Sequence, residues 1–150
     1  MAQDAPRIYL ATSQAFDAEM DDKIARHKAQ RGDGWITIEE PLNVADVLAQ
    51  QPSDHIVLVD CATLWLTNVI LADLDVAEHT TAFCDALVNC PARIVVVSNE
   101  VGYGIVPDNA LSRRFRNAQG RLNQMIAEPA DCVVTVMAGL PLALKGTLPQ

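Results

Sequence analysis

His27 stands among cations in the segment KIARHKAQR, residues 23–31. A neutral imidazole can attack a phosphorus atom and hold the product as a phosphoramidate. Lys28 and Arg31 would then neutralise phosphate oxygens as charge develops, and both cations favour the uncharged ring. This segment is therefore a candidate for nucleophilic phosphorus chemistry. The alternative interpretation is a histidine on a solvated, charged surface.

Asp60 closes the apolar run IVLVD, residues 56–60. In nucleotide-hydrolysing α/β proteins this pattern is a Walker B strand, whose acid faces a magnesium ion bound to the phosphates. Any parallel strand can also end in Asp, so the run alone leaves both interpretations open. The usual companion is a G-x-x-x-x-G-K-[ST] phosphate loop, and none of the glycines fits it. Lys145-Gly146-Thr147 has the right residue types in the wrong order.

Two further apolar runs end in polar residues. RIYLATS, residues 7–13, ends in Thr12 and Ser13, which could donate to a nucleotide or cap the next helix. IVVVSNE, residues 94–100, delivers a polar cluster into a glycine-punctuated loop. A buried strand with such a carboxyl end is typical of the ligand edge of an open α/β sheet. An ordinary strand followed by a loop is the alternative.

The remaining basic and imidazole groups have weaker indications of function. Four arginines lie on the helix predicted near residues 111–126, and they form a local basic cluster in an acidic chain. They are Arg113, Arg114, Arg116 and Arg121. We expect a solvated face, with a phosphate, an anionic substrate or an acidic neighbouring subunit as alternatives. His55 and His79 have no such neighbours, and we expect them to be structural or exposed.

The elements that must position these residues alternate along the chain. Apolar runs predict strands, and apolar residues at helical spacing predict the helices between them. The expected strands are 7–12, 35–39, 56–60, 94–98 and 132–137, and the expected helices lie near 16–24, 43–51, 64–74, 77–89 and 111–126. This order predicts a mostly parallel sheet with helices on both faces. The tail after Met137 is ambiguous.

Composition limits the class of protein. A chain of 150 residues fits a single domain, residues 1–150. The formal charge of −8 and the pI near 4.6 argue against nucleic-acid and acidic-membrane partners, because phosphate backbones need a basic surface. No apolar run has the length of a membrane span, and the start of the chain does not resemble a signal peptide.

Cysteine usage indicates the redox compartment. The chain has four cysteines, none in a C-x-x-C pair or at metal-site spacing from a histidine. We expect a reducing, cytoplasmic compartment. Cys61 and Cys132 lie in or beside apolar strand-like runs, where cysteine acts as a small hydrophobic residue.

Together these segments resemble the bifunctional adenosylcobinamide kinase/adenosylcobinamide-phosphate guanylyltransferase family of cobalamin biosynthesis. The resemblance rests on residues 8–31, 56–70 and 95–124, in family order. Its distinctive motifs are the A-T-S strand end, the H-K-x-x-R segment and the N-E-V-G-x-G-I-V-P loop. It implies a nucleotide-binding P-loop NTPase (RecA-like) α/β fold, usually assembled as a homotrimer. It also implies phosphate transfer from ATP or GTP to adenosylcobinamide, followed by GMP transfer from GTP to the adenosylcobinamide phosphate.

The resemblance also implies roles for individual residues. The family histidine that carries GMP covalently matches His27. Family nucleotide contacts map onto Ala11, Thr12, Ser13, Lys28, Ala29, Gln30, Arg31, Glu39 and Asp60. Asp60 stands where relatives often have Glu, and either acid can hold Mg2+, although the shorter side chain moves the charge inward. Without the family, Glu39 is an exposed strand-end acid or a ribose acceptor. Asn99 and Glu100 fit the matching loop and rank below the others.

The sequence departs from the family pattern before Arg7. Relatives have a strand, a G-G-x-R-S-G-K-S phosphate loop and a helix ahead of the A-T-S strand. Without that first strand and its P-loop, we expect unpaired strand edges and exposed apolar surface. Either the start of the chain is set too late, or the chain is a truncated form with little or no activity. The alternatives to the enzyme are thus a non-catalytic homologue, as a fragment or assembly partner, and a general nucleotide-binding module.

Overall fold

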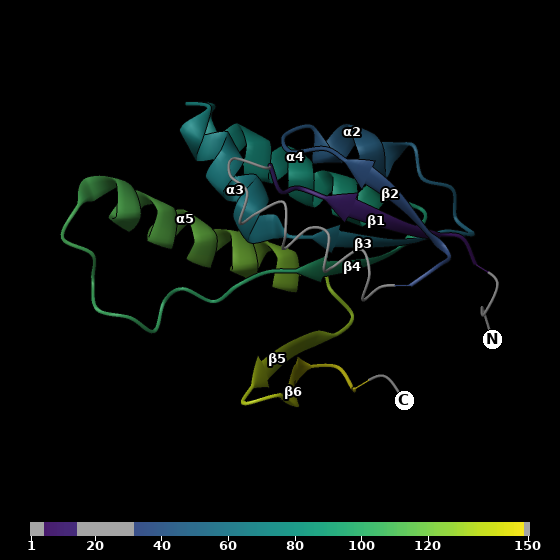
Figure 1. Cartoon of the computed structure of the whole chain (residues 1–150). Helices are drawn as coiled ribbons and strands as arrows, with labels where there is room; N and C mark the ends of the chain where they lie inside the picture. The colour runs from purple at the N-terminus through teal and green to yellow at the C-terminus, as the bar shows by residue number, and fades with distance from the viewer. Residues whose placement is uncertain (1–4, 15–31, 149–150) are drawn as a thin grey trace.

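The computed structural model describes residues 5–14 and 32–148. Within them, parallel strands form a sheet in the order β2-β1-β3-β4, and β5 and β6 form a separate antiparallel pair (Figure 1). The strands are β1 Arg7–Ala11, β2 Trp35–Glu39, β3 Ile56–Asp60, β4 Arg93–Val97, β5 Val133–Met137 and β6 Leu140–Lys145. The helices are α2 Val44–Ala49, α3 Ala62–Leu71, α4 Val76–Asn89 and α5 Ala110–Ala127.

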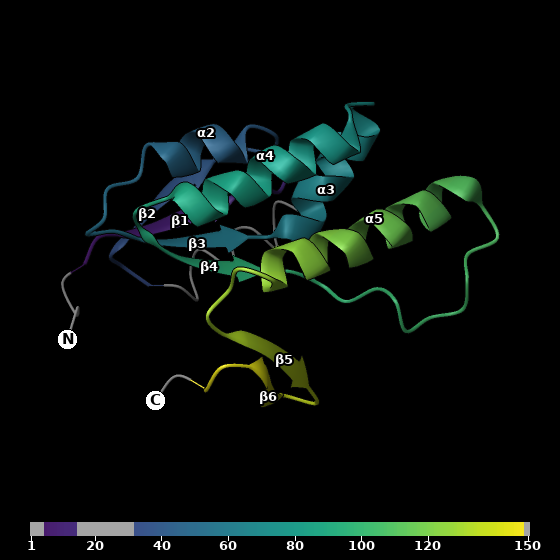
Figure 2. The same cartoon turned by 180° about the vertical axis from the view of Figure 1, so that it is seen from behind.

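The apolar core lies between the parallel sheet and helices α2, α3 and α4, which lie on the same side of it (Figures 1 and 2). Strand geometry alternates side chains between faces, so β1 and β3 each direct two large residues into this core. These residues are Ile8, Leu10, Val57 and Val59. Trp65 of α3 stacks on Phe83 of α4 with ring centroids 4.6 Å apart. Helix α5 packs against α3 and α4, so the helices form one continuous layer.

The predicted parallel α/β sheet is confirmed, and the strand and helix bounds differ from the predicted ones by a few residues at most. Helices were predicted on both faces of the sheet, whereas the described helices form a single layer on one face. The predicted break near Asp73–Asp75 separates α3 from α4, because Asp75 caps α4 by accepting from Glu78 N at 3.0 Å. The helix predicted near residues 16–24 lies outside the described residues. Among the described helices, none combines the length and apolar character needed to cross a bilayer.

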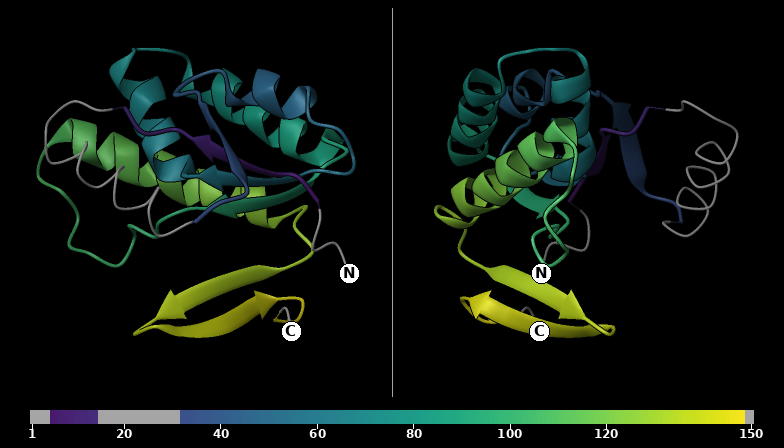
Figure 3. Two further views of the ribbon diagram at one scale, coloured as in Figure 1. Left: turned by 45° about the vertical axis from the view of Figure 1, so that its right-hand side comes forward. Right: turned by 90° about the vertical axis from the view of Figure 1, so that its left-hand side faces the viewer.

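The fifth predicted strand forms, but outside the parallel sheet where it was expected. Within the described residues, β5 pairs only with β6, which is the ambiguous tail (Figure 3). An apolar run predicts a strand and gives no information on the partner strand. Cys132 lies directly before β5, beside an apolar run as predicted, and is exposed.

Strand β4 is the last strand of the described parallel sheet, and some of its apolar side chains are poorly covered by other residues. Its Val95 and Val97 are 54% and 41% exposed. Because side chains two residues apart share a face, this exposed apolar surface lies on one face of β4.

Candidate functional site

The carboxyl ends of the parallel strands place three predicted nucleotide contacts in a row. The register pairs Ala11 with Glu39 on one side and with Asp60 on the other. Two strand spacings of about 4.8 Å separate the outer backbones by roughly 10 Å. Ser13 follows β1 two residues beyond Ala11 and is half-buried. The carboxyl end of the sheet therefore carries the Ser13 hydroxyl with one carboxylate on each side of its strand.

Asp60 is oriented by a neighbouring strand. Tyr9 lies two residues before Ala11 and on the same face of β1 as Ala11. Its hydroxyl donates to Asp60 Oδ2. Tyr9 is itself buried, with its ring edge-on to Trp35 at a centroid distance of 6.3 Å. Strand pairing and this hydrogen bond together give the half-buried Asp60 carboxylate a defined orientation.

A single strand-end carboxylate suits Mg2+ brought by a nucleotide. Mg2+ prefers oxygen ligands and usually takes one or two from the protein and the rest from phosphate and water. Among the residues with described positions, no cluster of three or more His, Cys, Asp or Glu side chains could hold a metal ion. The chemistry of Asp60 therefore fits a metal shared with phosphates.

Thr12 is fully buried, and its hydroxyl is engaged by the backbone. Its Oγ1 donates to Cys61 O and accepts from Cys61 N, both at 2.8 Å. The Asn68 side chain of α3 donates to Thr12 O at 2.8 Å and to Pro41 O at 3.0 Å. Of the two predicted hydroxyl contacts, Ser13 is thus the more accessible one. Sequence reasoning missed Asn68, and the available signal was an amide within the apolar stretch ATLWLTNVIL.

The two acids at the end of β2 differ in their surroundings. Glu39 is exposed, as one of its two interpretations requires. Glu40 Oε1 accepts from Leu42 N at 2.9 Å and from Asn43 N at 2.8 Å, so this carboxylate shapes the turn into α2. Glu39 is therefore the acid of this pair that can face a ligand.

Cys61 follows Asp60 and has a structural role. Burial raises the pKa of its thiol, and its Sγ accepts from Leu64 N at 3.5 Å as the cap of α3. A thiol with a raised pKa is a poor nucleophile at neutral pH. A covalent step through this cysteine is therefore disfavoured.

The polar end of β4 is held by α5. Gln119 is fully buried, and its Nε2 donates to Ser98 Oγ at 2.9 Å and to Asn123 Oδ1 at 2.8 Å. Asn123 Nδ2 donates to Asn99 O at 3.1 Å, and Asn99 N donates to Thr63 Oγ1 at 2.8 Å. The predicted loop residues at the end of β4 are thus fixed by amide and hydroxyl groups of two helices.

The predicted basic cluster divides into two kinds of arginine. Arg113 donates to Pro107 O at 2.9 Å and Asp108 O at 2.6 Å, and Arg116 donates to Gly102 O. These two hold the carbonyls of the glycine-punctuated loop against α5. The other two arginines of the cluster are exposed, as a solvated face requires.

Other candidates lie away from the strand ends. His55 Nδ1 contacts Asp54 Oδ1, and His79 Nδ1 contacts Asp75 O, both at 2.9 Å, as structural or exposed histidines do.

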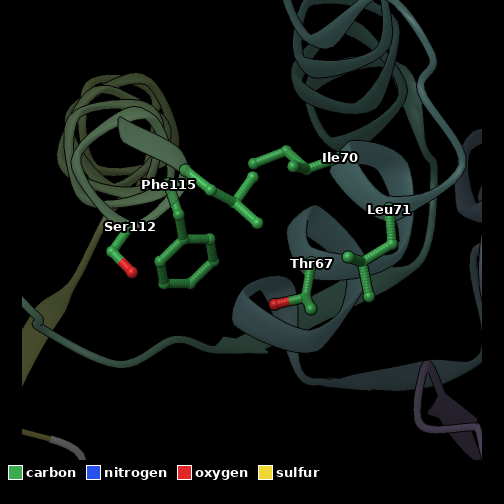
Figure 4. A pocket seen from close by; sticks show the side chains of 6 residues that line it. Thr67, Ile70, Leu71, Ser112 and Phe115 are labelled. Carbon is green, nitrogen blue, oxygen red and sulfur yellow. The ribbon is translucent and has the colours of Figure 1, made fainter. Parts of the chain in front are cut away.

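A mainly apolar pocket of about 270 Å³ opens between α3 and α5 (Figure 4). It is lined by Thr67, Ile70, Leu71, Leu111, Ser112 and Phe115. It includes none of the predicted nucleotide contacts. Five further predicted contacts, His27, Lys28, Ala29, Gln30 and Arg31, lie outside the described residues.

Known proteins resemble this chain over nearly its whole length. The family model described as cobinamide kinase / cobinamide phosphate guanyltransferase matches residues 1–144. The bifunctional adenosylcobalamin biosynthesis protein CobP of Pseudomonas aeruginosa is 46% identical over 143 residues, which cover 92% of this chain and 82% of that protein. The bifunctional adenosylcobalamin biosynthesis protein CobU of Salmonella typhimurium is 38% identical over 163 residues, with coverages of 95% and 88%. The protein of the same name from Escherichia coli is 34% identical over 154 residues, with coverages of 92% and 85%.

Proposed function

The chain belongs to the cobinamide kinase / cobinamide phosphate guanyltransferase family, and we propose that it performs both transfers on adenosylcobinamide. The kinase step moves the γ-phosphate of ATP or GTP to the aminopropanol hydroxyl. The guanylyltransferase step moves GMP from GTP to that phosphate and gives adenosylcobinamide-GDP. The observation that carries this proposal is the row of Glu39, Ala11 and Asp60 at the carboxyl edge of the sheet.

The described residues supply part of a nucleotide site. Asp60 would hold Mg2+, and the ion, when bound, would neutralise phosphate charge. Ser13 donates a hydroxyl close to the same strand ends, and Glu39 offers an acceptor for a ribose hydroxyl. Lys28 and Arg31 supply positive charge for the phosphates, and Ala11, Thr12, Ala29 and Gln30 complete the proposed contacts.

In the guanylyltransferase step, a neutral ring nitrogen of His27 attacks the α-phosphorus of GTP. A P–N bond forms, the bond to the bridging oxygen breaks, and pyrophosphate leaves with its electron pair. A phosphate oxygen of adenosylcobinamide phosphate then attacks the same phosphorus. The P–N bond breaks, and the imidazole returns to its neutral form.

The finer properties belong to the same proposal. We expect GTP, ATP and Mg2+ as ligands, one domain over residues 1–150, and a homotrimer. The four cysteines are all free, which supports a reducing, cytoplasmic compartment. The net charge of −8 does not suit a nucleic-acid partner.

Intact-mass analysis after incubation with GTP and Mg2+ tests the covalent step. We expect a GMP adduct on the wild-type chain and its loss in His27→Ala. His79→Gln is the matched control, because the ring nitrogen of this histidine bonds the backbone carbonyl of Asp75, the cap of its own helix, and the variant should retain the adduct. A folded wild-type chain without the adduct, or a persistent adduct in His27→Ala, would contradict the proposal.

A second version of the protein tests whether phosphate transfer requires a phosphate loop ahead of the A-T-S strand. This version carries the strand and G-G-x-R-S-G-K-S segment of the family ahead of the A-T-S strand. Phosphate transfer to adenosylcobinamide only in the extended version would identify the 150-residue chain as the non-catalytic form. Transfer by both versions would show that other residues replace the loop.

A further inference from the structure

Two buried polar side chains join the strand ends that carry the proposed nucleotide site. Thr12 follows β1 and is 0% exposed, and Asn68 lies on α3 and is 6% exposed. One amide nitrogen of Asn68 donates to Thr12 O at 2.8 Å and to Pro41 O at 3.0 Å. The Thr12 hydroxyl exchanges two hydrogen bonds with the backbone of Cys61. The segments after β1, β2 and β3 therefore meet at these two side chains.

These contacts lie beyond the end of the sheet pairing, which stops at Ala11, Glu39 and Asp60. Past this level the described strand ends share two backbone hydrogen bonds, Thr12 N to Asp60 O at 3.1 Å and Glu40 N to Ala11 O at 2.9 Å. Loops that leave a sheet have no ladder to fix them. Their positions consequently depend on side-chain contacts.

An apolar residue at position 68 would fill the space without needing partners. It would also leave the buried Thr12 carbonyl and the half-buried Pro41 carbonyl without this donor, which is costly. The Asn68 amide therefore donates to one carbonyl in each of two loops. Because Asn68 lies on a helix, this position sets the distance between the two loops. Ser13 follows one of these loops and Glu39 precedes the other.

We propose that Asn68 is a positioning residue for the nucleotide site, which acts through Thr12 and the Pro41 loop and does not touch the nucleotide. This proposal rests on the proposed function. Without the amide, Ser13, which lies past the end of the ladder, loses its fixed placement relative to Asp60. A displacement of about 1 Å at such a site can lower a rate by about a hundredfold.

The experiment compares Asn68→Leu with a matched variant, Thr80→Val. Thr80 is also buried, but its hydroxyl donates to Val76 O and Ala77 O within its own helix. We expect Asn68→Leu to weaken Mg2+–GTP binding about tenfold or more in calorimetry and to slow adduct formation. Thr80→Val loses stability and keeps the affinity. If Asn68→Leu does not fold, Asn68→Ser keeps one donor and should weaken binding to an intermediate degree.

Hydrogen exchange gives a readout that needs no nucleotide. The amides of Cys61 and Glu40 should exchange faster in Asn68→Leu than in Thr80→Val. Wild-type affinity in a folded Asn68→Leu chain, or unchanged exchange at these amides, overturns the positioning role. A wild-type chain that binds no GTP overturns the proposed function instead, and the exchange data then decide separately whether Asn68 fixes the loops.

Discussion

Strands β3 and β5 have similar sequences and very different surroundings. Each spans five residues, IVLVD and VVTVM, and both are mostly β-branched. Strand β3 pairs with β1 and β4 and buries Val57 and Val59 completely. Strand β5 pairs with β6 within the described residues, and its Val136 is 66% exposed. The same pattern therefore gives core in one region and surface in the other.

The hairpin is attached to the rest of the molecule by polar contacts. Lys145 Nζ donates to Ala127 O at 3.2 Å and Glu128 O at 2.7 Å at the end of α5. Six large apolar residues of the hairpin are exposed, namely Val134, Val136, Met137, Leu140, Leu142 and Leu144. The register places Val134 and Val136 on one face of the hairpin and Met137, Leu140 and Leu142 on the other, so apolar side chains are exposed on both faces. An apolar run thus predicts a strand, but the packing of other segments against that strand determines whether its side chains are buried.

Thiol labelling should show the largest difference between the two regions. Burial raises the pKa of the Cys61 and Cys84 thiols, which lowers their reactive thiolate fraction, and both side chains are buried. Cys132, beside the hairpin, is exposed. We expect a maleimide to label Cys132 at least about a hundredfold faster than Cys61, because access to Cys61 requires local opening. Cys132→Ser should remove the fast phase, and rapid labelling of Cys61 would contradict a buried strand end.

A matched pair of valine truncations should give the next largest difference. Val59→Ala removes packing from a fully buried side chain, and we expect it to lower the free energy of unfolding by about 2 kcal/mol. Val136→Ala changes an exposed side chain and should cost less than about 0.5 kcal/mol. Urea denaturation measures both. If the two variants instead lost equal free energy of unfolding, and the loss became smaller when the protein was diluted, a partner chain would cover the hairpin.

Much of the fold could be predicted because the strong patterns are local. Ile56–Asp60 combines four apolar residues with a terminal acid, and its strand bounds are as predicted. The start of α3 was placed too late, near Leu64, because its cap is Cys61, which is not a usual capping residue. The place of β5 could not be predicted, since strand pairing depends on tertiary contacts between distant segments.

The candidate site shows the same division. Ser13 and Asp60 could be identified because they lie at the carboxyl ends of buried strands: Asp60 is the last residue of β3, and Ser13 is two residues past β1. Asn68 and Gln119 were missed because a polar residue within a helix usually faces solvent. Both are buried, and each has a partner on a segment more than 20 residues away in sequence, Thr12 for Asn68 and Ser98 for Gln119. The groups that position a site thus depend on packing, whereas those that face a ligand follow local patterns.

The smallest predicted effect lies in the hairpin turn, at Ala138. Met137 pairs with Leu140, and the two turn residues Ala138 and Gly139 have φ of 51° and 77°. Two-residue turns with positive φ favour Asn-Gly, and Ala pays a steric penalty there. Ala138→Asn should stabilise the hairpin by about 0.5–1 kcal/mol, and Ala138→Val should destabilise it.

Amide exchange in β5 and β6 measures this change directly. Because the hairpin shares few apolar contacts with the core, slower exchange in Ala138→Asn should leave the urea midpoint of the parallel sheet unchanged. A midpoint that rises together with hairpin protection would show that the two regions unfold as one unit. Identical exchange in the Asn and Val variants would contradict the strained turn.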